Sequence, residues 1–279
     1  MSSLTVLETG PLATIQDAGR AGQAALGVPA SGACDRGAYA LANRLVGNPV
    51  GAAAVEVTYG GLVLHADQDL VVAITGAPCT GVPLNAPATL RAGQVVRLGP
   101  PSSGLRTYVA VRGGIDVPEV LGSRSTDLLS GLGPAPLTAN QTLPVGSSVE
   151  PMPGVDLAPV AHPPGGQVVL RVTPGPRRDW FTDAGRASLV AQTYQVSSNS
   201  NRVGVRLDGE LLERARTGEL ASEGMARGAI QIPPSGTPVI FLADHPVTGG
   251  YPVIAYVADA DLDACAQVRP GQAVRLISS

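Results

Sequence analysis

The sequence contains no lysine, so every one of its 19 basic side chains is an arginine. A Walker phosphate-binding loop requires a lysine, and we therefore do not expect this chain to bind a nucleotide through a P-loop. Schiff-base chemistry and serine nucleophiles activated by lysine are excluded for the same reason. The absence of one residue type thus removes several classes of enzyme.

Aromatic residues are also scarce, at 3 %, and the formal net charge is −3. A nucleic-acid-binding surface combines a basic face with stacking rings, so we expect no nucleic acid partner. The longest uncharged stretch, residues 128–149, is interrupted by prolines and glycines and is not expected to span a membrane. The first residues lack the basic segment and the apolar run of a secretory signal peptide.

Cysteine is rare as well. Cys34, Cys79 and Cys265 are far apart, and none belongs to a C-x-x-C pair. This spacing indicates neither a disulfide framework nor a zinc site, and the three histidines are equally scattered. We therefore expect no metal site and a reducing, cytoplasmic compartment.

Glycine and proline are abundant, with 35 and 25 residues. Short apolar or alternating runs bounded by these residues recur along the chain, a pattern typical of strands joined by tight turns. We predict a mainly β protein with a few helices. One helix is clear, because Asp35 is suited to cap its N-terminus and apolar residues follow at helical spacing. Gly47 and Pro49 are suited to end it.

A change of composition suggests how the chain is divided. Residues 150–166 contain five prolines and three glycines and form the best linker candidate. Such a segment is extended and semi-rigid. We therefore predict an N-terminal β-rich lobe at 1–150, a linker at 151–166 and a C-terminal β-rich lobe at 167–279.

Five segments place polar side chains beside glycines, which allow a backbone to approach a ligand closely. In the first, residues 14–20, Gln16, Asp17 and Arg20 present an amide, an acid and a guanidinium; the alternative is a turn in which Asp17 pairs with Arg20. In the second, residues 111–126, two glycines follow a predicted strand, and the polar run 123–126 could bind an anion. The alternative there is a corner with a solvated Arg124.

The other three segments lie in the C-terminal half. In residues 197–206, Arg202 and Arg206 are expected to share a strand face, either as a substrate clamp or as a salt-bridged surface. In residues 222–231, Glu223 precedes a glycine and Gln231 lies in an apolar strand, where its amide needs a neighbour or a ligand. In the fifth, Asp244 and the following histidine end an apolar strand, as a functional or a structural pair.

These segments, in this order, resemble one family of proteins over nearly the whole chain. The family is called allophanate hydrolase subunit 2, and its members are also described as biotin-dependent carboxyltransferase subunits or as the C subunit of 5-oxoprolinase. Five motifs in register carry the resemblance: TIQDAGR with GVPASGACD, LANRLVGNP, VRGGIDVPEVLGSRST, SNRVGVRLDG and GAIQIPPSGTPVIFLADHPVTGGYP. The resemblance implies a two-lobed, cyclophilin-like β-barrel architecture.

The resemblance also implies partners. With a subunit 1 type (KipI-like) chain and a LamB/YcsF-like chain, such proteins are similar to bacterial ATP-dependent 5-oxoprolinase, which opens 5-oxoproline to glutamate. ATP is then expected on another subunit, and the chain is expected to be inactive alone. Allophanate hydrolysis by amidase chemistry uses a Ser-Ser-Lys constellation, which a lysine-free chain cannot supply.

Two alternatives remain open. In the first, the chain is a carboxyltransferase component that moves a carboxyl group from carboxybiotin to urea or another amide. A biotin carrier needs a lysine amine, so biotin would be attached to a separate carrier chain. In the second, the chain is a regulatory module that captures a kinase-inhibitor-like partner.

Both enzyme hypotheses involve a planar amide on whose oxygen negative charge develops, so we expect arginines from both halves to converge on it. The candidate proton acceptors are Asp17, Glu223 and Asp244. The predicted substrate-binding residues are Gln16, Arg20, Arg112, Ser123, Arg124, Ser125, Asn201, Arg202, Gln231, His245, Thr248 and Tyr251. We also expect Arg124 and Arg202 to be exposed, so that alanine at either position abolishes turnover with little effect on folding.

Overall fold

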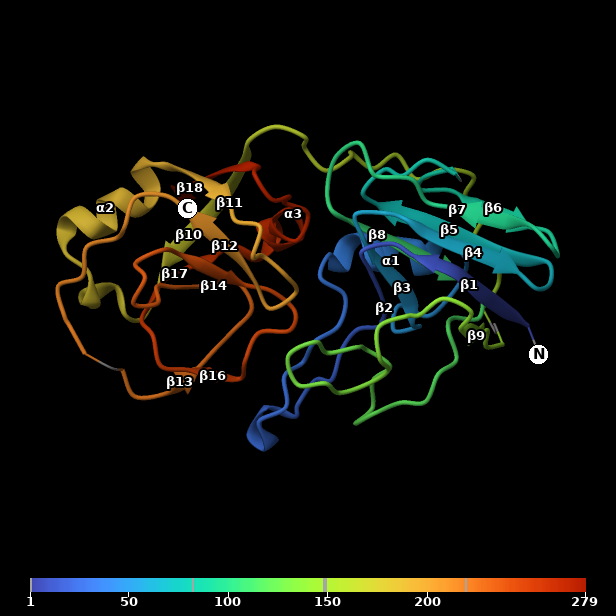
Figure 1. Cartoon of the computed structure of the whole chain (residues 1–279), viewed down its shortest axis with the longest axis horizontal. Coiled ribbons are helices and arrows are strands. Elements are labelled where there is room, and N and C mark those ends of the chain that lie inside the picture. Colours follow the sequence, from blue (N-terminus) through green and yellow to red (C-terminus); the bar gives the residue numbers. More distant parts are fainter. Residues whose placement is uncertain (1, 82, 148–149, 219) are drawn as a thin grey trace. The chain divides into compact units, whose positions relative to one another are not determined.

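The computed structural model describes residues 2–81, 83–147, 150–218 and 220–279. The chain divides into two compact units (Figure 1). The first comprises Met1–Arg20, Ser31–Asp127 and Gly131–Pro163, and the second comprises Ala21–Ala30, Leu128–Ser130 and Pro164–Ser279. The change of unit after Pro163 falls inside the proline- and glycine-rich segment. Two short loops that the sequence assigns to the N-terminal lobe belong instead to the second unit, and neither contributes a strand to the sheets of the first.

The first unit contains two antiparallel sheets. The five-stranded sheet has the order β2-β3-β8-β5-β6, and the four-stranded sheet has the order β7-β4-β1-β9. The strands are β1 (Ser3–Thr9), β2 (Leu12–Gln16), β3 (Ala54–Thr58), β4 (Leu62–Ala66), β5 (Leu70–Gly76), β6 (Pro87–Leu90), β7 (Val95–Arg97), β8 (Arg106–Val111) and β9 (Thr142–Pro144). A turn at Gly93 separates β6 from β7.

Successive side chains of the central strands in the five-stranded sheet join two different core clusters. Val55 and Val57 of β3 join a core cluster that also contains Val6 of β1, in the other sheet. Ala54 of β3 and Ala73 of β5 belong to a second cluster, together with residues of helix α1 (Arg36–Leu45). Since successive side chains of a strand point to opposite faces, the large residues fill the space between the sheets. The small residues leave room for the helix.

Helix α1 begins and ends where the sequence predicts. Asp35 is its N-cap and accepts a hydrogen bond from the backbone N–H of Ala38 at 2.8 Å. Gly47, just after the helix, has a φ of +65°, a conformation that glycine adopts without a Cβ clash. The helix packs on β5 and β8 through its buried residues Tyr39, Ala42 and Leu45.

The second unit is built on a closed barrel with the strand order β10-β17-β14-β15-β12-β11-β18. Strands β10 and β18 pair in parallel, and the other barrel pairs are antiparallel. The strands are β10 (Val168–Pro174), β11 (Thr193–Val196), β12 (Gly204–Asp208), β14 (Ala229–Gln231), β15 (Val239–Phe241), β17 (Val253–Val257) and β18 (Ala273–Ser278). Two further short strands, β13 (Glu223–Gly224) and β16 (Thr248–Gly249), pair with each other outside the barrel.

Alternation along these strands separates the interior of the barrel from its outer face. In β10 the residues alternate strictly between buried and exposed over Val168–Val172. Ile230 of β14 pairs with Ile240 of β15, and both are fully buried. The neighbouring positions, Val239 and Phe241, therefore point to the other face. Val239 and Phe241 line a pocket that is described below.

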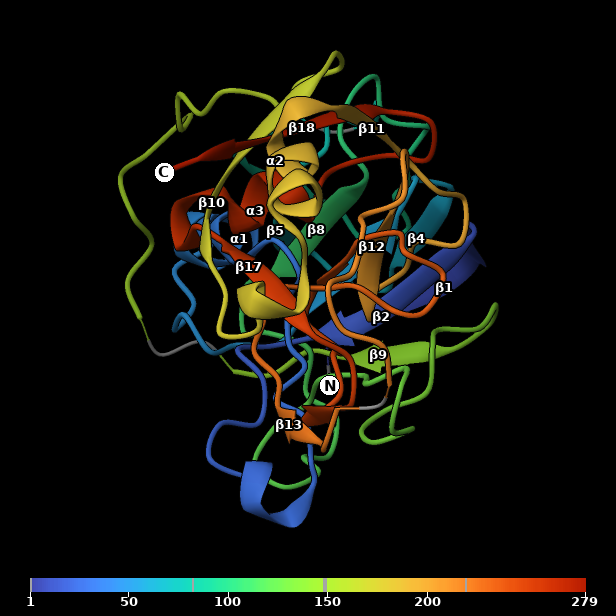
Figure 2. The same cartoon turned by 90° about the vertical axis from the view of Figure 1, so that its left-hand side faces the viewer.

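Helices are few, as the sequence predicts. The α-helices of the described residues are α1, α2 (Asp183–Ala191) and α3 (Leu262–Cys265), and the 3₁₀ turns are η1 (Ala24–Leu26), η2 (Arg178–Trp180) and η3 (Asp259–Asp261). Helix α2 packs on β18 of the barrel, which Figure 2 shows from the side. In the described part of the chain, no helix has the length and apolarity needed to cross a membrane. The prediction of a mainly β, barrel-containing fold is confirmed.

Candidate functional site

The candidate residues of the first unit gather around Asp17, which follows β2. Its Oδ1 accepts hydrogen bonds from the backbone N–H of Gly19 (2.8 Å) and the hydroxyls of Ser123 (2.7 Å) and Ser125 (2.5 Å). Its Oδ2 accepts one from the backbone N–H of Arg124 at 2.6 Å. The first two predicted segments therefore meet at a buried carboxylate whose two oxygens are both engaged by protein donors. We call this arrangement the Asp17 cluster.

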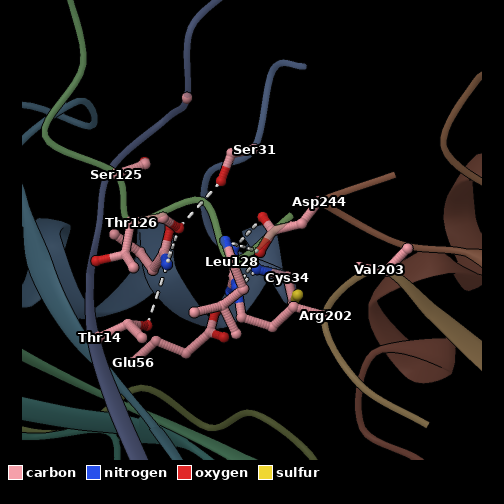
Figure 3. A network of polar contacts seen from close by, with 12 residues as sticks. Thr14, Ser31, Cys34, Glu56, Ser125, Thr126, Leu128, Arg202, Val203 and Asp244 are labelled. Atoms are coloured by element: carbon pink, nitrogen blue, oxygen red, sulfur yellow. Dashed lines mark hydrogen bonds and ion pairs between the residues drawn. The ribbon is translucent and has the colours of Figure 1, made fainter. Parts of the chain in front are cut away.

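Gln16, the last residue of β2, is fully buried beside this cluster. Its Nε2 donates to the Thr14 hydroxyl (3.0 Å) and to the carbonyl of Thr126 (2.9 Å), which also accepts from the Ser31 hydroxyl at 3.2 Å (Figure 3). Its Oε1 is buried and accepts no hydrogen bond among the described residues. The amide thus holds the strand end to the chain near Thr126.

Arg20 is 1 % exposed and hydrogen bonds to backbone carbonyls instead of pairing with Asp17. Its Nε donates to the carbonyl of Val120 at 3.1 Å, and its Nη2 donates to the carbonyl of Ser125. The space for this guanidinium comes from Gly133, where a Cβ would lie 2.6 Å from the arginine Nη2 and 2.0 Å from the Ser125 carbonyl oxygen. The predicted turn with an Asp17–Arg20 pair does not form, because the guanidinium donates instead to the carbonyls of Val120 and Ser125.

The guanidinium of Arg124 forms surface ion pairs. Its Nη1 lies 2.6 Å from Glu119 and its Nη2 lies 3.2 Å from Asp116, while its Nε donates to the carbonyl of Val117 at 2.7 Å. The side chain is 30 % exposed. The predicted solvated arginine is therefore a half-buried arginine held by two nearby carboxylates.

Arg112 bonds to backbone carbonyls in another part of the first unit. Its Nη1 donates to the carbonyl of Val46 at 2.9 Å, and its Nη2 donates to the carbonyl of Glu150 at 2.6 Å. The guanidinium thus ties the end of α1 to the segment that follows β9.

In the second unit, Arg202 and Asp244 form a buried, two-point ion pair (Figure 3). Nε of Arg202 lies 2.9 Å from Oδ2 of Asp244, and Nη2 lies 2.9 Å from Oδ1. Oδ2 also accepts a hydrogen bond from the backbone N–H of Leu128 at 3.1 Å. The prediction that Arg202 is exposed is wrong, since its side chain is 1 % exposed.

The prediction that Arg202 shares a strand face with Arg206 is wrong as well. Arg202 precedes β12 and lies in the loop before it, whereas Arg206 is exposed in the middle of that strand. Strand periodicity therefore does not relate the two side chains.

Three predicted residues line one pocket on the outer face of the barrel. Asn201, Gln231 and Tyr251 surround a space of about 150 Å³ together with residues of β12 and β15. The lining, which we call the barrel pocket, is Asn201, Val203, Gly204, Arg206, Gln231, Pro233, Val239, Phe241 and Tyr251. Residues from the third, fourth and fifth predicted segments therefore come together here.

Gln231 is nine-tenths buried, and its amide has a defined orientation. Its Nε2 donates to the carbonyl of Tyr251 at 3.1 Å and lies 3.7 Å from the sulfur of Met225. A carbonyl only accepts hydrogen bonds, so the amide NH₂ must face Tyr251 and Oε1 must face elsewhere. The NH₂ group of Gln231 thus has a hydrogen-bond acceptor within the protein.

Glu223, on β13, forms a two-point ion pair with Arg177. Its Oε2 lies 3.0 Å from the arginine Nε, and its Oε1 contacts Nη2. The pair anchors the short β13–β16 sheet to the segment after β10. Each predicted proton acceptor, Asp17, Glu223 and Asp244, is therefore held by protein donors.

His245 and Thr248 lie outside the barrel pocket. Nδ1 of His245 is 2.8 Å from the carbonyl oxygen of Pro246, and its ring centroid is 6.1 Å from that of Phe241. Thr248 begins β16 and lines a separate groove of about 490 Å³ with Pro29 and Leu129.

Two groups that are not among the predicted site residues have unusual surroundings. Arg206 lines the barrel pocket, and its position opposite Gln231 depends on a strand order that no local pattern reveals. In the first unit, buried Glu56 accepts from the hydroxyl of Tyr108 at 2.7 Å and from the backbone N–H of Cys34 at 2.9 Å. Burial and the nearby carboxylate of Glu56 raise the pKa of Tyr108 well above its usual value. An acid inside the apolar run AVEVT was the signal for this second group.

The fold and the site define a mainly β protein in which a closed barrel carries a small pocket, lined by apolar and polar side chains, on its outer face. Residues 26–278 match the family model described as carboxyltransferase domain, subdomain A and B, and the chain belongs to this family.

Named relatives are similar over the whole chain. The C subunit of the 5-oxoprolinase of Escherichia coli is 38 % identical over 98 % of this chain and 90 % of its own length. The crystal structure of TTHA0988 matches all of this chain at 35 % identity with a TM-score of 0.91. The urea carboxylase of Kluyveromyces lactis matches 99 % of this chain at 31 % identity with a TM-score of 0.87. The chain spans 56 % of the TTHA0988 chain and 27 % of the urea carboxylase.

Proposed function

We propose that this chain is a subunit of an ATP-dependent enzyme complex that hydrolyses the ring amide of 5-oxoproline to give glutamate. The observation that carries the proposal is the 38 % identity to the C subunit of a 5-oxoprolinase, over nearly the full length of both chains. Since that relative is named a subunit, we expect partner chains here too, of the subunit 1 (KipI-like) and LamB/YcsF-like types.

The barrel pocket supports the proposal through its size and its lining. A space of about 150 Å³ is below the 300–1,000 Å³ typical of sites for drug-sized ligands, and it suits a single small ring. Apolar side chains of β15 line it beside the polar groups of Arg206, Gln231 and Asn201. In our proposal this chain binds and orients the small amide.

The three predicted proton acceptors have another role in this proposal. Asp17 fixes the loop that carries Arg124, Asp244 fixes Arg202, and Glu223 holds the β13–β16 sheet through Arg177. We therefore propose that they act as positioning residues. The group that activates water, and the groups that bind ATP, would then come from the partner chains.

A second candidate function is supported by the family itself. The matching model describes a carboxyltransferase domain, and a urea carboxylase has the same fold at a TM-score of 0.87. In this alternative, the chain would bind urea or another amide while it accepts a carboxyl group from carboxybiotin. The chain has no lysine, so the biotin would be held by a separate carrier.

Reconstitution of the purified chain with its partner chains tests both candidates. Glutamate release from 5-oxoproline that requires ATP and stops when this chain is omitted supports the first. Carboxyl transfer from carboxybiotin to urea, without glutamate release, would replace it with the second. Tight partner binding without either reaction would contradict both and favour the regulatory role.

A further inference from the structure

Arg206 and Gln231 lie in one row across three neighbouring strands of the barrel. Arg206 of β12 is paired with Val239 of β15, and Val239 is paired with Gln231 of β14. Directly paired residues of antiparallel strands point to the same face, and neighbouring strands are about 4.8 Å apart. The two polar side chains therefore stand on the same outer face about 10 Å apart at their backbones, with Val239 between them.

Both polar side chains retain hydrogen-bonding capacity. The amide of Gln231 uses its NH₂ on the Tyr251 carbonyl, so Oε1 stays available as an acceptor, and it accepts no hydrogen bond from the described residues. Among the described residues, no carboxylate lies within ion-pair distance of the Arg206 guanidinium. The acceptor of a largely buried side chain and a cation without a carboxylate partner thus line the same small space.

The rest of the lining limits what can occupy this space. Gly204 precedes Arg206 by two residues and lies on the same outer face of β12. It has no side chain, and a Cβ there would lie 3.0 Å from a methyl group of Val239. Val239 and Phe241 supply an apolar floor. Asn201 uses its Oδ1 to accept from the backbone N–H groups of Val203 (2.8 Å) and Gly204 (3.4 Å), so its NH₂ is a further donor at the rim.

We propose that Arg206 is the carboxylate anchor of the barrel pocket, which therefore selects a small cyclic amide bearing a carboxylate over a neutral amide such as urea. A guanidinium binds a carboxylate through two parallel, charge-assisted hydrogen bonds. The ring N–H donates to Gln231 Oε1, and the ring CH₂ groups rest on Val239 and Phe241. The proposal names the substrate class of the function proposed above and rests on it.

Ligand-detected NMR titrations of the full chain, alone and in complex with its partner chains, test this assignment. The probes are 5-oxoproline, 2-pyrrolidinone, which is the same ring without the carboxylate, and urea. We expect 5-oxoproline to bind at least about tenfold more tightly than 2-pyrrolidinone. Arg206→Gln should remove that advantage and leave 2-pyrrolidinone binding unchanged. Arg275→Gln, at another exposed arginine of the barrel on β18, is the matched control and should change neither.

A second variant probes the other end of the row. Gln231→Leu removes the acceptor and should weaken 5-oxoproline and 2-pyrrolidinone by a similar factor, with folding checked by circular dichroism. Equal binding of the two rings, or an Arg206→Gln variant that binds 5-oxoproline like the wild type, would overturn the assignment. So would absence of 5-oxoproline binding both to the chain alone and to the complex.

Failure of this inference can be distinguished from failure of the proposed function. If the complex releases glutamate and Arg206→Gln leaves its KM for 5-oxoproline unchanged, the anchor is wrong and the function stands. If the carboxylate-dependent binding is present and no glutamate is released, the anchor stands and the reaction is a different one.

Discussion

The Asp17 cluster of the first unit and the barrel pocket of the second both contain polar side chains. They differ in whether the hydrogen-bonding groups of their central side chains are engaged by the protein. In the cluster, the carboxylate oxygens accept from two hydroxyls and two backbone N–H groups. In the pocket, Gln231 keeps a free acceptor and Arg206 keeps its charge uncompensated among the described residues. Polar residues beside glycines therefore include a buried carboxylate engaged by protein donors at both oxygens, as well as the side chains of our candidate binding pocket.

The largest expected effect comes from comparing Arg202, in the loop before β12, with Arg206, in that strand. Arg202→Ala should lower the free energy of unfolding by about 3–5 kcal/mol, because it removes the two-point guanidinium partner of the buried Asp244 carboxylate. Arg206→Ala, four residues later and exposed, should change it by no more than about 0.5 kcal/mol. Urea denaturation of both variants measures the difference. Similar stabilities would show that the buried pair is not what separates these two arginines.

This pair of arginines also shows which features can be predicted from the sequence and which cannot. The cap at Asp35 and the break at Gly47 depend on neighbours in the chain, and both were predicted correctly. Whether Arg202 is buried depends on Asp244, whose strand end reaches it only in the folded barrel. The row from Arg206 to Gln231 depends on the order β14-β15-β12, which side-chain periodicity does not encode.

The Asp17 cluster should be sensitive to the loss of a single oxygen. In Asp17→Asn, an NH₂ group replaces one of the two carboxylate oxygens. This donor then faces the backbone N–H of Gly19 or of Arg124, which can only donate and cannot accept a hydrogen bond. An unsatisfied buried donor costs about 1–3 kcal/mol, so we expect a loss of about 2–3 kcal/mol in urea denaturation. Ser123→Ala, which removes one hydroxyl donor and leaves the carboxylate intact, should cost about 1 kcal/mol. Equal losses of stability in the two variants would mean that water satisfies the hydrogen-bonding groups left unpaired in the cluster.

A substitution beside the barrel pocket should change the binding of 5-oxoproline more than it changes the stability of the protein. At Gly249 of β16 a Cβ would lie 2.8 Å from Nε2 of Gln231 and 3.2 Å from Cγ of Met225. Gly249→Ala should displace the amide, lower stability by about 1 kcal/mol and weaken 5-oxoproline binding severalfold. Gly224→Ala, in the paired strand, meets no atom within 4 Å and serves as the control. Unchanged binding in Gly249→Ala would show that the orientation of Gln231 does not matter.

The smallest expected effect concerns a carboxylate that collects hydroxyl donors as Asp17 does, but on a half-exposed surface. The Ser3 hydroxyl at 2.6 Å, followed by His65 and Thr5, holds the pKa of Asp67 below its usual value. A lowered pKa in the folded state stabilises the protein above the unfolded value, near about 3.9, and this stabilisation is lost as the pH falls through the folded value.

Asp67→Asn should therefore lower the melting temperature slightly at pH 7, and the difference from the wild type should shrink as the pH falls below about 4. Thermal denaturation across this range measures the change, with Asp17→Asn compared at each pH. Solvent screens the partly exposed Asp67, so its loss should be smaller than that of the buried Asp17. A loss as large as that of Asp17→Asn would show that the donors around a carboxylate, rather than its burial, set what it contributes.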